Sequence, residues 1–360
     1  MLADILGHQS VVASLRHGLA ANRLAQTYLF VGDNQIGKTT TARALAKVLL
    51  CDNRSIDPID SCDTCAACRS IDADSHSDVR QIGPTGPSRI LRIAQFWPRD
   101  GVKEHPADRA MLRDLYFAPV SGKRRIFIVE AAESMNEDTA NSLLKVLEEP
   151  PSYTLFILTA SSVQAVLPTI LSRSQTLRFA PVPEPEIAAR LIAIGLSSQK
   201  ATLLAAYAQG RPGIALRAAS SPTAMTARDD ILNAAEESSS GAPVIAGYKI
   251  ADDLRKASAK LNDLSSGEED SGPRTLLASS CDVLVLWYRD LLVSKISKGK
   301  AQVLNIDRVD VINNQAQRYH KSEIEEAINL VQDTRRYIAR NANAQIATEY
   351  LMLNLLSLGR

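Results

Sequence analysis

The sequence predicts an α/β domain built on a mostly parallel sheet, followed by an all-helical region. From Leu24 to Thr176, short apolar runs alternate with helical patterns, which is typical of strands and helices wound into a parallel sheet. After Phe179, a Pro-Val-Pro segment resets the backbone, and only helical patterns follow. The chain has 360 residues, 45% of them hydrophobic, so two or three domains can each bury a core.

Four apolar runs are predicted to be strands of the sheet. Each is bounded by turn or polar residues, and they are Tyr28–Val31, Val79–Ile82, Ile126–Val129 and Leu155–Leu158. Residues 136–149, between the last two runs, have apolar side chains at helical spacing. Pro150 and Pro151 are expected to end this helix, because proline cannot continue it.

The helical region beyond residue 184 is predicted to contain two breaks. The polar segment Glu236–Gly241 is expected to be a linker, and Leu264–Gly272 is expected to be a loop. Gly210–Gly213 is expected to form a turn between helices or a helix start. Apolar residues around Trp287 and near the C-terminus recur at helical spacing, so the last third is predicted to be a helical bundle.

The charge balance argues against a global attraction to nucleic acid or to acidic membranes. Lys plus Arg number 41 and Asp plus Glu number 40, so the formal net charge is +1. No stretch approaches the roughly 18 apolar residues that a membrane helix needs, and the N-terminus lacks the pattern of an export signal. We therefore expect a cytoplasmic protein that does not bind membranes.

Residues 32–39, Gly-Asp-Asn-Gln-Ile-Gly-Lys-Thr, match a phosphate-binding loop. The motif follows a predicted strand and opens a predicted helix, which is the context that this chemistry requires. Gly32 and Gly37 let successive amides face phosphate oxygens. Lys38 is expected to reach the outer phosphates, and Thr39 to hold Mg²⁺ through its hydroxyl. Chance produces this pattern in roughly one or two per cent of such chains, so we expect nucleotide binding, with ATP and Mg²⁺ as the candidate ligands.

Hydrolysis of a bound nucleotide needs carboxylates at the end of another strand. Glu130 follows the run Ile126–Val129 and can serve the Mg²⁺ ion. The next residue, where a second carboxylate would polarise the attacking water, is Ala131. Glu133 either replaces that group or, more simply, is an acid at a helix N-terminus that favours the helix dipole. We expect nucleotide binding, and self-catalysed hydrolysis is doubtful.

Four of the five cysteines cluster within eighteen residues. Cys51, Cys62, Cys65 and Cys68 have the spacing of a structural Zn²⁺ site with four thiolate ligands, because two-residue spacers let thiolates converge on one ion. Unliganded buried thiols are the alternative. Direct contact of the cluster with nucleic acid has little support, since no basic or aromatic residues are interleaved with it. Cys281 lies alone on an apolar helical face and is expected to be a packing residue.

Several short segments form a specific set in a fixed order. They are Gly7–Gln9, Tyr28–Phe30, the four-cysteine insertion, Gly122–Arg125, Leu171–Ser174 and, most specific, the run Ala-Asn-Ser-Leu-Leu-Lys-Val-Leu-Glu-Glu-Pro-Pro at residues 140–151. With them the chain resembles the AAA+ subunits of the bacterial DNA polymerase III clamp loader, most closely those of the delta-prime type. The resemblance is dense over roughly residues 1–180, and Trp287–Asp290 and Asn341–Asn343 resemble the collar helices of that family.

This resemblance implies three domains and a set of partners. The domains are a nucleotide-binding AAA+ domain at residues 1–180 with a zinc insertion at 51–68, a small helical lid at 181–235 and a helical collar at 236–360. The partners are gamma or tau and delta subunits in a hetero-pentamer, the sliding clamp, and primed DNA through the assembled complex. Such a loader, part of the DNA polymerase III holoenzyme, uses ATP to open the clamp, and this chain would have no polymerase site of its own.

The resemblance also implies that Arg173 is a catalytic finger in trans, which projects into the ATP site of a neighbouring subunit. A guanidinium suits this role, because its rigid fork can bridge the charge on a transferred phosphoryl group. The alternative is an arginine that pairs locally at the end of a strand. Thr159 and Ser161 lie where a nucleotide-sensing hydroxyl is expected, although a hydroxyl at a strand end is usually only a turn residue.

Three departures from the family pattern bear on the mechanism. Ser174 replaces a usual cysteine and should leave the finger intact. Ala131 and Gly213 stand where motor subunits carry a water-polarising glutamate and a phosphate-sensing arginine. These two losses favour a stator subunit over a self-sufficient gamma- or tau-type ATPase, which is the main alternative. A nucleic-acid module and a small-molecule nucleotide kinase are weaker rivals, given the neutral charge and the long helical tail.

Overall fold

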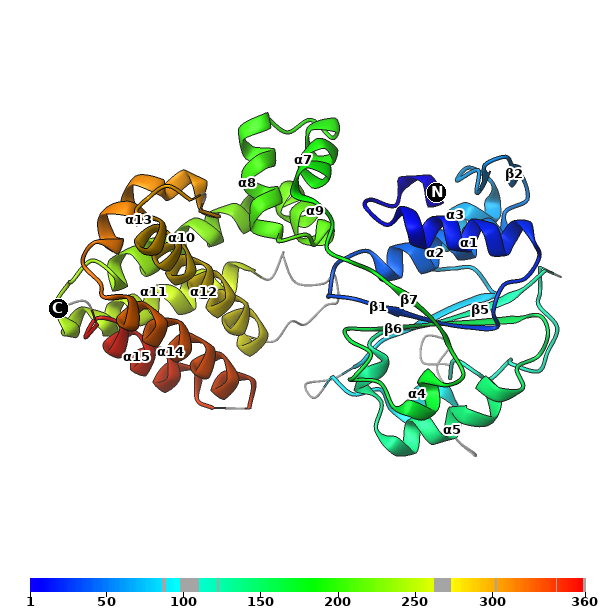
Figure 1. The fold of residues 1–360 in the computed structure, drawn as a ribbon. Helices are drawn as coiled ribbons and strands as arrows, with labels where there is room; N and C mark the ends of the chain where they lie inside the picture. The colour runs from blue at the N-terminus through cyan, green and yellow to red at the C-terminus, as the bar shows by residue number, and fades with distance from the viewer. Residues whose placement is uncertain are drawn as a thin grey trace. The chain divides into compact units, whose positions relative to one another are not determined.

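A computed structural model of the chain describes residues 1–85, 89–97, 110–121, 123–261, 273–301, 303–340 and 342–358. It divides into two compact units (Figure 1). Unit 1 comprises Met1–Glu186 and Gly210–Gly213, and unit 2 comprises Ile187–Gln209 and Ile214–Arg360. Gly122, Asn341 and the predicted loop 264–272 lie outside the described residues.

Unit 1 alternates strands and helices along the chain. Its elements are η1 (Leu2–Asp4), α1 (Gln9–Ala20), β1 (Thr27–Val31), α2 (Lys38–Leu50), β2 (Ser55–Ile56), β3 (Ile59–Asp60), α3 (Ala66–Asp72), β4 (Val79–Ile82), α4 (Ile93–Phe96), β5 (Arg125–Val129), η3 (Ala132–Ser134), α5 (Glu137–Glu148), β6 (Thr154–Ala160), α6 (Pro168–Leu171) and β7 (Gln175–Arg178).

The main sheet of unit 1 has the strand order β4-β5-β6-β1-β7, and every neighbouring pair is parallel. Val31 at the end of β1 pairs with Ala160 at the end of β6, and Val129 of β5 pairs with Leu158. The carboxyl ends of these strands therefore lie along one edge. Ligands of open parallel sheets usually bind at this edge.

Side chains of the central strands alternate between two hydrophobic cores. Leu29, Phe127 and Phe156 belong to the core that α4, α5 and α6 share, whereas Tyr28 and Phe30 belong to the core that α1, α2 and α3 share. Figure 1 shows α1, α2 and α3 on one face of the sheet and α4 and α5 on the other. Burial on both faces explains why these strands are continuous apolar runs in the sequence.

All regular elements in the described residues of unit 2 are helices. Its elements, with the start of α7 in unit 1, are α7 (Glu184–Ala193), α8 (Ser198–Ala208), α9 (Pro212–Ser220), α10 (Pro222–Ser238), η4 (Val244–Ala246), α11 (Gly247–Ala259), α12 (Pro273–Ser297), η6 (Ile306–Arg308), α13 (Val309–Ala316), α14 (Lys321–Ala339) and α15 (Ala344–Leu355). One core joins α10 through α15 around the fully buried Trp287 and Tyr288.

The predicted fold class is confirmed, because a parallel sheet with helices on both faces precedes an all-helical unit. The four predicted strands are present. The main sheet has β7 as a fifth strand, and β2 and β3 form a separate two-stranded sheet; these three strands were not predicted from the sequence. No helix among the described residues is long and apolar enough to span a membrane.

The predicted linker at Glu236–Gly241 is wrong at its start, because α10 continues through Ser238. Ser238 and Ser239 are buried, and each hydroxyl donates to the carbonyl of Ala235 at 2.8 Å. Ser239 Oγ also accepts a hydrogen bond from Trp287 Nε1 at 3.1 Å. Serines that look like a solvated linker in the sequence thus face the core with their hydroxyls satisfied.

Candidate functional sites

The predicted phosphate loop connects β1 to α2. Gly37 is the N-cap of α2 and has a φ of +113°, a left-handed conformation that glycine adopts at little cost. Thr41 Oγ1 donates to the carbonyl of Gly37 at 2.9 Å. The first amides of α2 have no carbonyl partner within the helix, and they carry the positive end of its dipole. The backbone here fits a bound phosphate group.

Lys38 is buried at the start of this helix. Its ammonium group donates to the carbonyls of Gly32 and Asp33, the latter at 2.8 Å. An ammonium has three donors, so one is left for a phosphate oxygen. Burial lowers the pKa of Lys38, although the carboxylates of Glu133 and Asp33 act in the opposite direction.

Both candidate carboxylates follow β5: Glu130 comes directly after the strand, and Glu133 lies in η3. Glu130 Oε1 accepts a hydrogen bond from Gln81 Nε2 at 2.7 Å. Ala131 has a φ of +49°, and its amide donates to the hydroxyl of Thr159 at 3.2 Å. Glu133 Oε1 accepts from the amide of Ser161 at 3.1 Å. Glu133 therefore joins the ends of β5 and β6, and the position after Glu130 has no carboxylate.

The four clustered cysteines converge, as the sequence predicts. Their sulfur atoms all lie within 4.8 Å of one another, with 3.5 Å between Cys51 and Cys62 and 3.9 Å between Cys51 and Cys65. Sulfur atoms at the corners of a tetrahedron around Zn²⁺ are about 3.8 Å apart, given Zn–S bonds of about 2.3 Å. This thiol set can hold a metal ion, and the identity of the ion as Zn²⁺ stays a prediction.

The elements around the cluster place each sulfur. Cys51 is the C-cap of α2, Cys65 is the N-cap of α3, and Cys68 lies within α3. Amides donate to the sulfurs in sequence: Cys62 N to Cys51 Sγ at 3.3 Å, and Cys65 N to Cys62 Sγ at 3.3 Å. Hydrogen bonds from amides stabilise thiolates, and hydrogen bonds to ligand atoms also orient those ligands toward the metal. Hydrogen bonds from Thr64 and from the Cys65 amide lower the pKa of Cys62 to about 6.

Cys281 lies apart from this cluster in α12 and is fully buried. Burial raises the pKa of its thiol to about 12, as expected for an inert packing residue.

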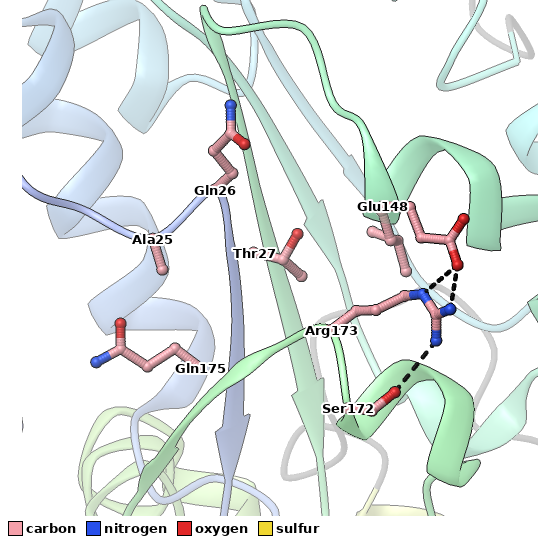
Figure 2. Close-up of a pocket in the computed structure, with 8 residues that line it drawn as sticks. Ala25, Gln26, Thr27, Glu148, Ser172, Arg173 and Gln175 are labelled. Carbon is pink, nitrogen blue, oxygen red and sulfur yellow. Dashed lines mark hydrogen bonds and ion pairs between the residues drawn. The ribbon is translucent and has the colours of Figure 1, made fainter.

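Arg173 lies in the turn between α6 and β7 and lines a pocket of about 570 Å³ (Figure 2). Its side chain is 29% exposed and forms an ion pair with Glu148 at the end of α5. Nε donates to Glu148 Oε1 at 2.8 Å, and Nη1 donates to Ser172 Oγ at 3.1 Å. The guanidinium is thus held by partly exposed groups.

The pocket of Arg173 and the phosphate loop lie at opposite ends of the same strands. Thr27 at the start of β1 and Gln175 at the start of β7 line the pocket, whereas Gly32 directly follows the end of β1. A five-residue strand spans roughly 17 Å. Arg173 therefore cannot serve a nucleotide on the loop of its own chain.

Comparisons with known proteins agree with this architecture. A family model described as DNA polymerase III, delta subunit, matches residues 7–183. The chain is 27% identical to the DNA polymerase III subunit delta' of Bacillus subtilis, over 96% of this chain and 95% of that protein. The resemblance predicted from the sequence is confirmed: the chain is similar to the clamp-loader subunits of DNA polymerase III.

The chain is also similar to a tau subunit and to a solved gamma subunit-related protein. The B. subtilis tau subunit is 27% identical over 85% of this chain, which spans only 52% of tau. A solved gamma subunit-related protein from Thermotoga maritima covers 96% of this chain and aligns over 100% of its own length, at 16% identity and a TM-score of 0.46. The alignment with delta' reaches nearly end to end in both proteins, and the one with tau does not.

Three side chains at these sites received no role from the sequence. Glu148 pairs with Arg173 from 25 positions away, Gln81 donates to Glu130, and His8 Nε2 contacts the carbonyl of Ile36 at 2.8 Å. His8 lies in the Gly-His-Gln segment and Glu148 in the run 140–151, so the resemblance indicated their segments and not their partners.

Proposed function

We propose that this chain is a delta-prime-like stator subunit of a DNA polymerase III clamp loader, which helps to place the sliding clamp on primed DNA in the cytoplasm. Its partners would be gamma or tau and delta subunits in a hetero-pentamer. The near end-to-end similarity to delta' supports this proposal.

Arg173 would act in trans on ATP bound by a neighbouring motor subunit. The observation that carries this role is its place at the amino ends of β1 and β7, roughly 17 Å from the loop of its own chain. A partly exposed arginine at that end is available to another subunit only. Its guanidinium would stabilise the charge that develops on the transferred phosphoryl group.

The chain's own nucleotide would be held without rapid hydrolysis. The backbone from Gly32 to Gly37 and the ammonium of Lys38 would bind the phosphates, and Thr39 and Glu130 would hold Mg²⁺. The residue after Glu130 is Ala131, so the site lacks the carboxylate that would polarise the attacking water. The bound nucleotide would mainly stabilise unit 1.

The decisive experiment is Arg173→Ala in a reconstituted loader. We expect the DNA-stimulated ATPase of the complex to fall by about 100-fold or more, because arginine fingers contribute about 10³- to 10⁵-fold to phosphoryl transfer. Arg178→Ala, a change of the same residue type within β7, is the control and should leave the rate nearly unchanged. An unchanged rate with Arg173→Ala, in a complex of normal mass, would remove the finger from the proposal.

A self-sufficient gamma- or tau-type ATPase is the second candidate, favoured by the complete phosphate loop and the similarity to tau. It predicts steady turnover by the isolated chain that Lys38→Ala abolishes. The stator predicts stoichiometric nucleotide binding with negligible turnover in the same assay.

A further inference from the structure

We propose that Gly213 is a positioning residue of the phosphate loop: its backbone holds the loop in its nucleotide-binding shape before any nucleotide arrives. This inference rests on the nucleotide binding in the proposed function, and it assigns a role to a residue that the sequence marks only as a departure from the motor subunits.

The contact joins the start of α9 to the loop. The amide of Gly213 donates to the carbonyl of Gln35 at 2.9 Å. Gly213 is the second residue of α9, so its amide has no carbonyl partner within the helix. The hydrogen bond satisfies this amide and fixes the Gln35 carbonyl at the same time.

Only glycine fits at this position. A Cβ atom on residue 213 would lie 2.8 Å from the carbonyl oxygen of Gln35 and 3.1 Å from its Cβ. The nearest atom belongs to the backbone, which cannot rotate away as a side chain can. Any larger residue would therefore displace residue 213 from Gln35.

The turn that contains Gly213 is hydrogen-bonded to the segment after β7 in unit 1. Val182 donates its amide to the carbonyl of Gly210 at 2.9 Å. Gly210 has a φ of +77°, and a Cβ there would lie 2.6 Å from Cβ of Pro181. Residues 210–213 thus pack closely on the rest of unit 1 at both ends, so the position of the Gly213 amide is fixed.

Four carbonyls of the loop have polar contacts. Gln35 accepts from Gly213, Ile36 lies 2.8 Å from His8 Nε2, and the carbonyls of Gly32 and Asp33 accept from Lys38. In a planar trans peptide the N–H points opposite to the C=O. The contacts that fix the carbonyls of Gln35 and Ile36 therefore also fix the directions of the next two amides, those of Ile36 and Gly37.

The backbone conformation of Gln35 agrees with this. Its φ of +65° is left-handed, and turns of this kind form the amide concavities that bind anions. A non-glycine residue is held in this conformation at a cost, so the surrounding contacts must maintain it. The Gly213 contact is one of them, and it does not depend on a bound nucleotide.

The test compares Gly213→Ala with the control Gly18→Ala in the full chain. Both replace a helical glycine and gain helix propensity, and the atom nearest to a Cβ at Gly18 is the end of the flexible Leu24 side chain, at 2.9 Å. Hydrogen exchange of residues 32–39 is measured without nucleotide, and the affinity for a fluorescent ATP analogue with Mg²⁺ is measured in parallel.

We expect Gly213→Ala to speed exchange in the loop by about 10-fold and to weaken nucleotide binding by about 5- to 10-fold, because the binding-competent shape becomes less populated. The control should change neither quantity. In the unmodified chain, the Gly213 amide should itself be protected from exchange without nucleotide, and this measurement needs no variant.

Three results would overturn the inference: unchanged loop exchange in Gly213→Ala, free exchange of the Gly213 amide in the unmodified chain, or tighter nucleotide binding by the variant, which would make the contact an obstacle to binding. If the chain binds no nucleotide at all, the nucleotide-binding part of the proposed function fails, while the exchange measurements still decide the role of Gly213.

Discussion

The two ends of the parallel sheet in unit 1 are built differently. At the carboxyl ends of the strands, three groups hold the phosphate loop: the buried side chains of Lys38 and His8 and the amide of the half-buried Gly213 all contact its carbonyls. At the amino ends, Arg173 is held by one carboxylate, that of Glu148, and by partly exposed groups beside it.

This difference matches two kinds of task. A loop that binds a ligand in place gains from being held in shape beforehand, since less ordering is then needed on binding. If Arg173 contacts a second subunit, as proposed, it must be able to dissociate from Glu148, and exposed ion pairs of this kind contribute only about 0–1 kcal/mol. The comparison predicts larger effects for changes in the phosphate loop than for changes at the ion pair of Glu148 with Arg173.

The largest effect is expected from the four-cysteine site, where Cys51 caps the C-terminal end of α2, away from the phosphate loop at the start of that helix. The double variant Cys62→Ser with Cys65→Ser should abolish metal binding. It should also lower the free energy of unfolding of unit 1 by several kcal/mol, because the free energy of metal binding contributes to the folding of such small insertions. Metal analysis and thermal unfolding measure both effects. Cys281→Ala is the control and should keep the metal. A double variant that retains a stoichiometric ion would contradict the ligand assignment.

The next effect concerns Lys38. Lys38→Ala should weaken nucleotide binding by about 100-fold, which corresponds to about 2.7 kcal/mol, because it removes a charge-assisted hydrogen bond to phosphate. Titration of the isolated chain with nucleotide measures the affinity. Arg173→Ala is the reciprocal control, and its affinity should match that of the unmodified chain. Weaker nucleotide binding by Arg173→Ala would contradict the claim that Arg173 does not act on the phosphate loop of its own chain.

A smaller effect should appear as a pH dependence of stability. Burial lowers the pKa of His8 below its usual 6.5, although the Ile36 carbonyl acts against this. As the pH falls through 6.5, the unfolded chain takes up the proton first, so stability falls and then levels off below the folded pKa. Urea unfolding at pH 7.5 and 5.5 should show an extra loss of up to about 1 kcal/mol relative to His8→Gln. Parallel pH profiles would rule out His8 as the source.

The smallest effect is expected at Glu148. Glu148→Gln should change the free energy of unfolding by less than about 1 kcal/mol, because it removes only a partly exposed ion pair. Urea unfolding measures this value, and Glu149→Gln, at the neighbouring residue, is the control. A loss above about 2 kcal/mol would show that Arg173 is fixed as firmly as the phosphate loop.

Local patterns predicted much of this protein. Four strands, the loop before α2 and the convergence of the cysteines each depend on a short contiguous segment whose residues carry their own geometry. The linker at Glu236–Gly241 was mispredicted because Ser238 and Ser239 are polar in composition and yet find buried hydrogen-bond partners in α10 and at Trp287. Composition alone cannot tell a solvated serine from a buried, satisfied one.

The sequence by itself determined the phosphate-binding motif, the thiol set, and the absence of a carboxylate after Glu130, since these need only residue identity and spacing. The tertiary structure alone decided that Glu148 pairs with Arg173, that Glu133 joins two strand ends, and that Gly213 contacts Gln35. The partners in these contacts are 25, 28 and 178 positions apart, and only the order of the strands and the return of the chain after α8 bring them together.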